Sequence, residues 1–287
     1  MKKLKVYLNG KIVPIAEAKI SILDRGFFYG DGVFESLRTH QGQPFLLDEH
    51  LKRLLKAAKS IKLKKIPSFR SLKLAVIKTL RANKLKESYI KIIFTRGESQ
   101  GHGLDAANTI GKPTMIILVE PVKDLTKKAY EVGLKAIIST IMRTDVPSTR
   151  IKSLCYLDAI LAKMEAKKHG ADEAFFIDKN GNLTEGTVSN VFIVKFDTIY
   201  TPPLTSPLLA GITRKLAIKL AKESAFRVIE KAVSPKELYT ADECFITSSG
   251  AGIVPIAKVW NKKIGKGRRG YVTESLIGRY NSVTKKS

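Results

Sequence analysis

The segment from Leu183 to Val194, Leu-Thr-Glu-Gly-Thr-Val-Ser-Asn-Val-Phe-Ile-Val, limits the fold of this chain more than any other. It follows an Asn-Gly dipeptide at 180–181 that lies between two apolar runs, a pattern typical of a β-hairpin. Glu185, Ser189 and Asn190 nevertheless put a carboxylate, a hydroxyl and a carboxamide where a buried strand is expected. Burying such groups unpaired costs about 1–3 kcal/mol each, so we expect partners for them, either within the protein or in a polar ligand.

Hydrophobic periodicity divides the rest of the chain into strand and helix segments. The pattern is lost between Pro121 and Lys128 and then resumes, which indicates a domain boundary. We therefore expect two α/β domains, residues 1–121 and 122–287. Strands are expected at 5–9, 11–15, 33–39, 89–95, 114–120, 131–141, 199–203, 226–230 and 243–247, and helices at 48–61, 69–84, 154–169 and 212–224, before a basic tail.

The segment from Val33 to Thr39 alternates as a strand does, so its side chains divide between two faces. An arginine and a serine that share a face with an aromatic ring can line a cavity, but the pattern also fits an edge strand with one solvated side. Asp48 is expected to cap the helix that follows. One face would carry Val33, Glu35, Leu37 and Thr39, and the other Phe34, Ser36 and Arg38.

The chain is strongly basic, with 51 Lys and Arg against 26 Asp and Glu and a formal net charge of +25. Such a charge is compatible with nucleic-acid binding. The lysines are nevertheless spread along the whole chain and form no arm with interleaved aromatic residues. This distribution favours a solvated surface adapted to heat or salt, and we expect no dedicated nucleic-acid role.

Several classes of protein are disfavoured by simple counts. No apolar run approaches the roughly 20 residues of a membrane span, so we expect no membrane association and a cytoplasmic location. Two cysteines, Cys155 and Cys244, and four histidines give neither a disulfide framework nor the spacing of a zinc site. We therefore expect no metal.

Three motifs in the second half of the chain resemble those of a known family. They are Ile-Lys-Ser-Leu-Cys-Tyr-Leu at 151–157, Glu-Gly-Thr-Val-Ser-Asn-Val-Phe at 185–192 and Leu-Leu-Ala-Gly-Ile-Thr-Arg at 208–214. In this order they are similar to the motifs of the class IV (fold type IV) pyridoxal-phosphate-dependent aminotransferases. That family includes branched-chain and D-amino-acid aminotransferases and aminodeoxychorismate lyase. The resemblance extends from Tyr7 to about Tyr280.

The resemblance implies an α/β protein with the two-domain fold of D-amino-acid aminotransferase. A smaller N-terminal α/β domain would precede a larger C-terminal domain containing a pseudo-barrel, with pyridoxal 5'-phosphate in the cleft between them. Members of the family are homodimers, and loops of one subunit close the site of the other. Tyr29 or the polar loop from Arg96 to Asp105 would then act across the subunit interface.

The same resemblance assigns the cofactor-binding residues. Lys152 would be the catalytic Schiff-base lysine and the proton shuttle, and such a lysine must be neutral for part of the cycle. Glu185 would keep the pyridine nitrogen protonated, which makes the ring an electron sink. The helix that begins at Ile212 would offer free N–H groups to the phosphate. The other implied cofactor-binding residues are Arg53, Tyr156, Ser189, Asn190, Leu209, Gly211, Ile212, Thr213, Ser248 and Ser249.

The substrate is less narrowly indicated. The Tyr-Gly-x-x-Val-Phe-Glu-x-x-Arg pattern resembles that of branched-chain enzymes, so we expect transfer from a branched-chain L-amino acid to a 2-oxo acid such as 2-oxoglutarate. The alternatives are a D-amino-acid aminotransferase and aminodeoxychorismate lyase, which forms 4-aminobenzoate. Lys91 stands where many branched-chain enzymes have arginine. The implied substrate-binding residues are Tyr29, Phe34, Arg38, Tyr89, Lys91, Gly250 and Ala251.

Overall fold

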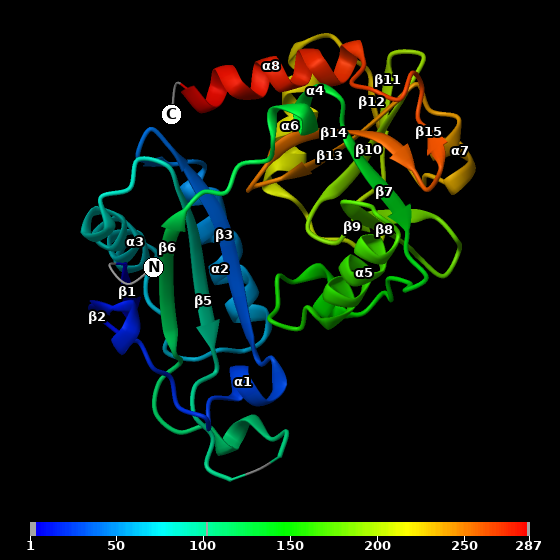
Figure 1. Cartoon of the computed structure of the whole chain (residues 1–287). Helices are drawn as coiled ribbons and strands as arrows, with labels where there is room; N and C mark the ends of the chain where they lie inside the picture. Colours follow the sequence, from blue (N-terminus) through cyan, green and yellow to red (C-terminus); the bar gives the residue numbers. More distant parts are fainter. Residues whose placement is uncertain (1–3, 102, 286–287) are drawn as a thin grey trace. The chain divides into compact units, whose positions relative to one another are not determined.

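The computed structural model describes residues 4–101 and 103–285, and the chain divides into two compact units (Figure 1). Unit 1 contains the chain up to Lys123 together with the short segment Ile151–Cys155. Unit 2 contains Asp124–Arg150 and the chain from Tyr156 onward. The segment Ile151–Cys155 therefore belongs to unit 1, although a boundary after residue 121 would assign it to the second domain.

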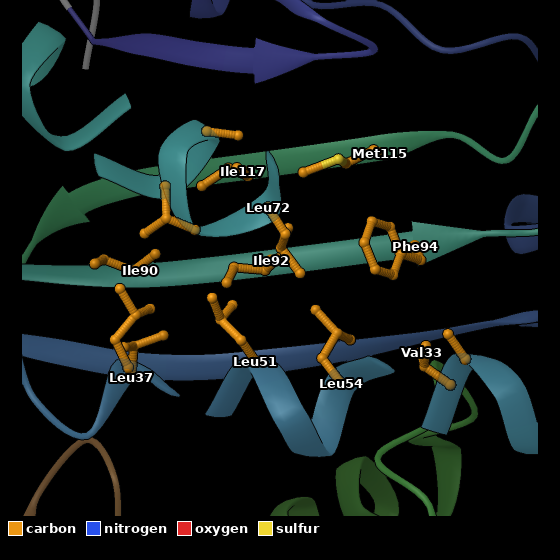
Figure 2. Packing of buried hydrophobic residues seen from close by; sticks show 14 of the residues in the cluster. Val33, Leu37, Leu51, Leu54, Leu72, Ile90, Ile92, Phe94, Met115 and Ile117 are labelled. Carbon is orange, nitrogen blue, oxygen red and sulfur yellow. The ribbon is translucent and has the colours of Figure 1, made fainter. Parts of the chain in front are cut away.

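Unit 1 is a six-stranded sheet in the order β2-β1-β6-β5-β3-β4, covered on one face by two helices. Figure 2 shows how leucines of α2 and α3 pack on the apolar side chains of β3, β5 and β6. The elements are β1 (Lys5–Leu8), β2 (Lys11–Pro14), α1 (Arg25–Tyr29), β3 (Gly32–His40), β4 (Gln43–Pro44), α2 (Leu47–Ser60), α3 (Phe69–Asn83), β5 (Ser88–Thr95) and β6 (Met115–Pro121), with 3-10 turns at Ile15–Glu17 and Ala106–Asn108.

The start of α2 differs from the sequence-based expectation. Leu46 precedes the helix in a left-handed conformation and caps it without a side-chain hydrogen bond, so the prediction of Asp48 as the cap is wrong. Asp48 lies in the first turn, where a carboxylate is favoured by the helix dipole. The first hairpin is confirmed, because β1 pairs antiparallel with β2 through the turn at Asn9 and Gly10.

The sheet of unit 2 contains a closed ring of six strands. Consecutive strands pair in the order β10-β13-β14-β7-β8-β9, and β9 pairs again with β10 through Glu185 and Asn190. The ring is therefore a small barrel, and β11, β12 and β15 extend it. The strands are β7 (Leu134–Ile138), β8 (Glu173–Ile177), β9 (Leu183–Gly186), β10 (Asn190–Lys195), β11 (Thr198–Thr201), β12 (Val228–Glu230), β13 (Glu243–Ser248), β14 (Gly252–Val259) and β15 (Lys262–Lys263).

Three sequence-based expectations for unit 2 are wrong in detail. The segment 183–194 forms two strands, and the Asn180-Gly181 turn joins β8 to β9 rather than to the run at 191–194. The strand expected at 131–141 is shorter, since α4 ends at Glu131 and β7 contains only Leu134–Ile138. The basic tail expected after residue 247 instead contains β14, β15 and α8. The helices are α4 (Lys127–Glu131), α5 (Leu157–Lys168), α6 (Ile212–Glu223), α7 (Pro235–Tyr239) and α8 (Tyr271–Lys285), with a 3-10 turn at Pro147–Arg150.

Two features are absent from the described residues. None of the helices in residues 4–101 and 103–285 is long and apolar enough to cross a membrane. In the same residues, no group of three or more His, Cys, Asp or Glu side chains could hold a metal ion.

Candidate active site

Lys152 lies beside the sheet of unit 1, next to β3. The amide of Phe34 donates a hydrogen bond to the carbonyl of Lys152 at 2.9 Å, and the amide of Leu154 donates to the carbonyl of Gly32 at 3.0 Å. These bonds, with an isolated β-bridge between Val33 and Ser153, attach the segment 151–155 to β3. The ammonium of Lys152 lies 4.4 Å from the centre of the Phe34 ring.

The sheet face opposite the helices gathers most of the expected substrate-binding residues. Phe34 and Arg38 alternate with the helix-facing residues of β3, and the β3–β5 register places Arg38 opposite Tyr89. Lys91 Nζ lies 4.9 Å from the centre of the Phe34 ring, so Lys91 and Lys152 share one aromatic ring. Burial lowers the pKa of Lys91, and the charge of Lys152 lowers that pKa further.

Ser36 is a residue of this face to which the sequence motifs assign no role. It lies between Phe34 and Arg38 on β3, and it is directly opposite Lys91 in the β3–β5 register. Its hydroxyl is buried and has no hydrogen-bond partner within residues 4–101 and 103–285. A buried hydroxyl next to an ammonium group is suited to a carboxylate.

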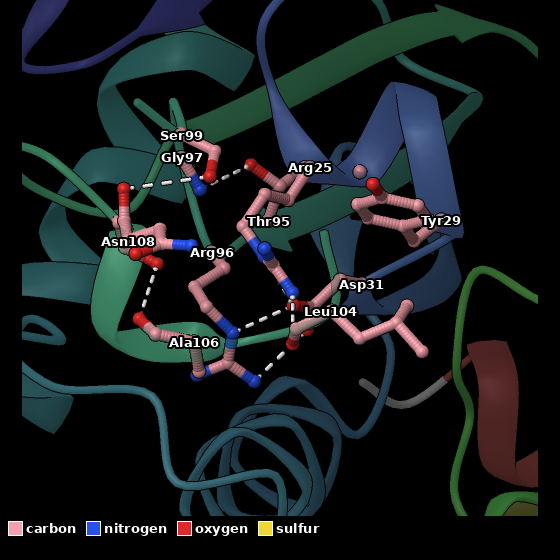
Figure 3. A network of polar contacts seen from close by, with 12 residues as sticks. Arg25, Tyr29, Asp31, Thr95, Arg96, Gly97, Ser99, Leu104, Ala106 and Asn108 are labelled. Atoms are coloured by element: carbon pink, nitrogen blue, oxygen red, sulfur yellow. Dashed lines mark hydrogen bonds and ion pairs between the residues drawn. The ribbon is translucent and has the colours of Figure 1, made fainter. Parts of the chain in front are cut away.

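Tyr29 is held by a polar network around the loop that follows β5 (Figure 3). The guanidinium of Arg25 donates to the carbonyls of Gly103 and Leu104 at 3.0 and 2.9 Å, and it also bonds Asp31. The amide of Gly103 donates to the hydroxyl of Tyr29 at 3.1 Å. Tyr29 and the loop thus form one structural unit, and His102 of this loop lies outside the described residues.

Arg53 is bound to a buried carboxylate that the sequence analysis did not assign. Glu35 lies on the helix-facing side of β3, where Arg53 Nε and Nη2 approach its two oxygens at 2.5 and 2.9 Å. His50 Nδ1 lies 2.7 Å from Glu35 Oε2. Burial alone would raise the pKa of Glu35, but the hydrogen bonds and charges of His50 and Arg53 outweigh it and lower the pKa to about 2. The fork of Arg53 is therefore fixed in orientation.

In unit 2, Glu185 is held from two sides at the point where the barrel closes. Arg143 Nη2 donates to Glu185 Oε1 at 2.9 Å, and the amide of Leu209 donates to Oε2 at 2.9 Å. Asn190 pairs with Glu185 in the ladder and donates from its side chain to the carbonyl of Leu209 at 3.0 Å. The structure thus brings together three expected residues, Glu185, Asn190 and Leu209. Arg143, to which the sequence motifs assign no role, joins them.

The segment that precedes α6 packs closely against Asn190. A Cβ atom on Gly211 would collide with Asn190 Oδ1, so the position has no room for a side chain. Gly211 caps α6 without a side-chain hydrogen bond, and Ile212 and Thr213 begin the helix. Helices without a side-chain cap keep N–H groups free for an anion.

The turn between β13 and β14 contains the remaining expected residues of unit 2. Ser248 Oγ accepts a hydrogen bond from the amide of Ala251 at 3.2 Å, and Ser249 and Gly250 form the tip of the turn. Thr247 lies opposite Asn190 in the ladder, and its buried hydroxyl has no partner within the described residues. The sequence motifs assign Ser248 and Ser249 to the cofactor but not Thr247, whose position opposite Asn190 became visible only in the fold.

Two more of the expected residues of unit 2, Ser189 and Tyr156, lie at the ends of a turn and a helix. Ser189 donates its hydroxyl to Glu173, a buried carboxylate of β8. Tyr156 caps α5, which begins three residues later than expected, and it packs against the core beside that helix. Tyr156 belongs to unit 2, whereas Lys152 belongs to unit 1.

The sequence is similar to those of known proteins along nearly its whole length. The model of the family "Amino-transferase class IV" matches residues 32–259. A putative branched-chain-amino-acid aminotransferase of Methanocaldococcus jannaschii is 41% identical over 99% of this chain and 97% of its own length. A D-alanine aminotransferase of Bacillus licheniformis is 35% identical over 95% of this chain and 94% of its own length.

The fold is also that of solved structures. The branched-chain amino acid aminotransferase of Escherichia coli superimposes with a TM-score of 0.93, is 32% identical, and is aligned over 99% of this chain and 96% of its own. The PLP-form of the Thermobaculum terrenum enzyme superimposes with a TM-score of 0.88 at 29% identity, over 99% of this chain and 95% of its own. The two-domain α/β fold implied by the sequence motifs is therefore confirmed. The chain belongs to the class IV aminotransferases, a family of pyridoxal-phosphate-dependent transaminases.

Proposed function

We propose that this chain transfers the amino group of a branched-chain L-amino acid to a 2-oxo acid such as 2-oxoglutarate, in two half-reactions. The names of the Methanocaldococcus jannaschii and Escherichia coli relatives support this choice of substrate. The observation that carries the proposal is the pair of ammonium groups, Lys152 and Lys91, that share the Phe34 ring. One amine would react with the cofactor, and the other would attract the carboxylate of the substrate.

The residues of unit 2 fit the cofactor. A pyridine nitrogen that carries a proton needs a buried carboxylate, and Glu185 is only 5% exposed and already oriented by Arg143. A phosphate needs hydrogen-bond donors, and the N–H groups at the start of α6 can supply them. The hydroxyl of Thr247, which has no partner in the described part of the chain, is a further donor. Because Gly211 has no side chain, Asn190 packs directly against the backbone that precedes α6.

Each residue then has a defined task. Bound pyridoxal phosphate supplies an electron sink that stabilises the negative charge left on the substrate Cα. Lys152 Nζ would accept the proton that leaves the substrate Cα. Lys91 and Lys152 lie beside the same ring, where burial and the charge of Lys152 lower the pKa of Lys91. Lys91 and Ser36 would bind the substrate carboxylate, and Arg53 would bind the phosphate with its orientation fixed by Glu35.

We also propose that the chain works as a homodimer. Side chains of α1 and its neighbouring loops expose an apolar patch, including Ile22, Phe27 and Leu104 at 75%, 71% and 78% exposure. A patch of this kind indicates a protein partner. Hydrogen bonds tie the backbone of Leu104 and the hydroxyl of Tyr29 to the network around Arg25, next to these exposed side chains (Figure 3). A cytoplasmic location is proposed on the basis of two free cysteines, Cys155 and Cys244.

Two alternatives share the same fold. The likeness to D-alanine aminotransferase favours a D-amino acid as donor. Aminodeoxychorismate lyase activity would release pyruvate without any 2-oxo acid acceptor. An assay for pyruvate in the absence of an acceptor separates the lyase from both transaminases.

The first experiment is the visible absorption spectrum of the purified protein before and after adding L-leucine, D-alanine and L-glutamate separately. We expect a yellow protein that bleaches with L-leucine and L-glutamate but not with D-alanine, and a Lys152→Ala variant that lacks the yellow band. Bleaching by D-alanine alone would show that the amino donor is a D-amino acid and would contradict the proposed substrate. A colourless wild-type protein after incubation with pyridoxal phosphate would overturn the proposal.

A further inference from the structure

Glu173 is a buried carboxylate that has no role in the function proposed above. It begins β8 and is 2% exposed. Its Oε1 accepts hydrogen bonds from the Thr187 hydroxyl at 2.5 Å and from the amides of Thr187 and Ala174 at 3.1 and 2.9 Å. Its Oε2 accepts from Ser189 Oγ at 2.9 Å. Among the described residues no basic side chain forms an ion pair with it, and the donors of these four hydrogen bonds are all neutral.

The strand register explains why these donors meet Glu173. Phe175 of β8 pairs with Gly186, the last residue of β9. Two residues before Phe175, Glu173 lies beyond the end of β9 and beside the turn 187–189. A Cβ atom on Gly186 would lie 3.0 Å from Glu173 Oε2, so the carboxylate is in close contact with the start of this turn.

The turn beside Glu173 connects the two residues that close the barrel. Glu185 precedes it and Asn190 follows it, and these two residues pair with each other. The amide of Gly186 donates to the carbonyl of Ser189 at 2.7 Å, which makes the turn tight. A change in the position of the turn therefore moves Glu185 and Asn190 together.

We propose that Glu173 is a positioning residue for the cofactor: by holding Thr187 and Ser189, it fixes Glu185 and Asn190 in the geometry that binds pyridoxal phosphate. The inference rests on the proposed cofactor role of Glu185. Leu209 and Arg143 orient the Glu185 carboxylate directly, whereas Glu173 sets the backbone that carries it. Losing a residue that orients ligand-binding groups typically weakens binding or activity by about 10- to 100-fold.

The test compares Glu173→Ala with Glu243→Ala. Glu243 is a matched control in the same unit, because its carboxylate also accepts from neutral donors: the amides of Val272 and Thr273 and the Thr273 hydroxyl. Its partners lie at the start of α8 rather than beside Glu185. For each apoprotein, the affinity for pyridoxal phosphate is measured by spectroscopic titration and the melting temperature by calorimetry.

We expect both variants to melt at a lower temperature than the wild type. Only Glu173→Ala should lose affinity for pyridoxal phosphate, by about 10-fold or more, and its bound cofactor should show a shifted absorption spectrum. An affinity and a spectrum equal to those of the wild type would overturn the inference, since Glu173 would then be purely structural. Failure of the wild type itself to bind the cofactor would overturn the proposed function instead.

A milder variant keeps the test decisive if Glu173→Ala does not fold. Thr187→Val preserves the shape of the side chain and removes only its hydroxyl bond to Glu173. We expect a loss of cofactor affinity in the same direction but smaller. Unchanged affinity in this variant, with an unchanged absorption spectrum, would likewise contradict the positioning role.

Discussion

At the scale of single residues, Arg143 and the Leu209 amide keep the Glu185 carboxylate oriented, which supports the role proposed for it at the cofactor. Glu185→Gln should retain the covalently bound cofactor but slow transamination by about 100-fold or more, since the neutral amide no longer favours a proton on the ring nitrogen. The measurement is kcat for L-leucine together with the visible spectrum. Full activity would remove Glu185 from the cofactor site.

Lys91 provides a second test at a single side chain. Lys91→Met should raise KM for 2-oxoglutarate by about 10-fold or more, because a charged hydrogen bond to the carboxylate is worth about 1.5–3 kcal/mol. Lys91→Arg keeps the positive charge and should retain most of the affinity. The two variants are compared by steady-state kinetics with the acceptor varied. Equal KM values for the wild type and the methionine variant would show that Lys91 does not contact the acceptor.

The individual residues also show where sequence analysis ends. The partner of Glu185 is Arg143, 42 positions earlier, and the partner of Glu35 is Arg53, 18 positions later. The pattern of a strand does not show which residue of another helix, strand or loop will pair with a glutamate in it. The motifs single out Lys152 and Glu185 as candidates, but the buried groups that orient Glu185 and Arg53 became visible only through tertiary contacts.

Helix α2 is attached to the sheet by charge as well as by apolar packing. The folded state holds Glu35 ionised down to a pKa of about 2, whereas its ordinary value is 4.5. The carboxylate therefore contributes stability that is fully present above pH 4.5 and is lost as the pH falls toward 2. Urea unfolding measured from about pH 5 to about pH 3 should show a decline in the free energy of unfolding that is absent in Glu35→Gln.

The same variant should be much less stable at neutral pH. Removing one member of a buried ion network typically costs about 3–5 kcal/mol, since Arg53 and His50 lose their common partner. Glu87→Gln is the control, because Glu87 pairs with Arg38 at 3.4 Å with its side chain 45% exposed. A control variant as unstable as Glu35→Gln would show that burial of the network does not matter.

The strands and helices were predicted with different success. Periodicity located β3, β5, α3 and α6 to within a few residues, because each has one apolar face on a core. It merged β9 with β10, since the turn at 187–189 is short and polar groups on both sides are buried. The closure of the barrel depends on one ladder pair, Glu185 with Asn190, and no repeating pattern in the sequence encodes a single pair.

For the whole molecule, the clearest expectation is dimerisation. Phe27→Asp combined with Leu104→Asp should convert a dimer into monomers and reduce activity, because charges would replace apolar side chains at the proposed interface. Phe196→Asp is the control, since Phe196 is 84% exposed but lies in the turn after β10. Light scattering coupled to gel filtration measures the mass. A wild-type monomer with full activity would contradict the proposed assembly.

The net charge of +25 also belongs to the molecule as a whole. Its lysines are dispersed, so we expect only weak binding to DNA that disappears at physiological salt. Fluorescence anisotropy with a labelled duplex at low and physiological salt checks this. Tight binding that persists at physiological salt would reveal a second role for the basic surface.

Because the segment Ile151–Cys155 belongs to unit 1 but lies between two segments of unit 2, neither unit is one continuous stretch of sequence. The chain leaves unit 2 after Arg150, contributes five residues to unit 1 and returns at Tyr156. A gene cut between the units would leave Lys152 on the fragment that lacks β3, the strand to which it is bonded. Expressing or exchanging the two units as continuous modules would therefore separate Lys152 from the strand that supports it.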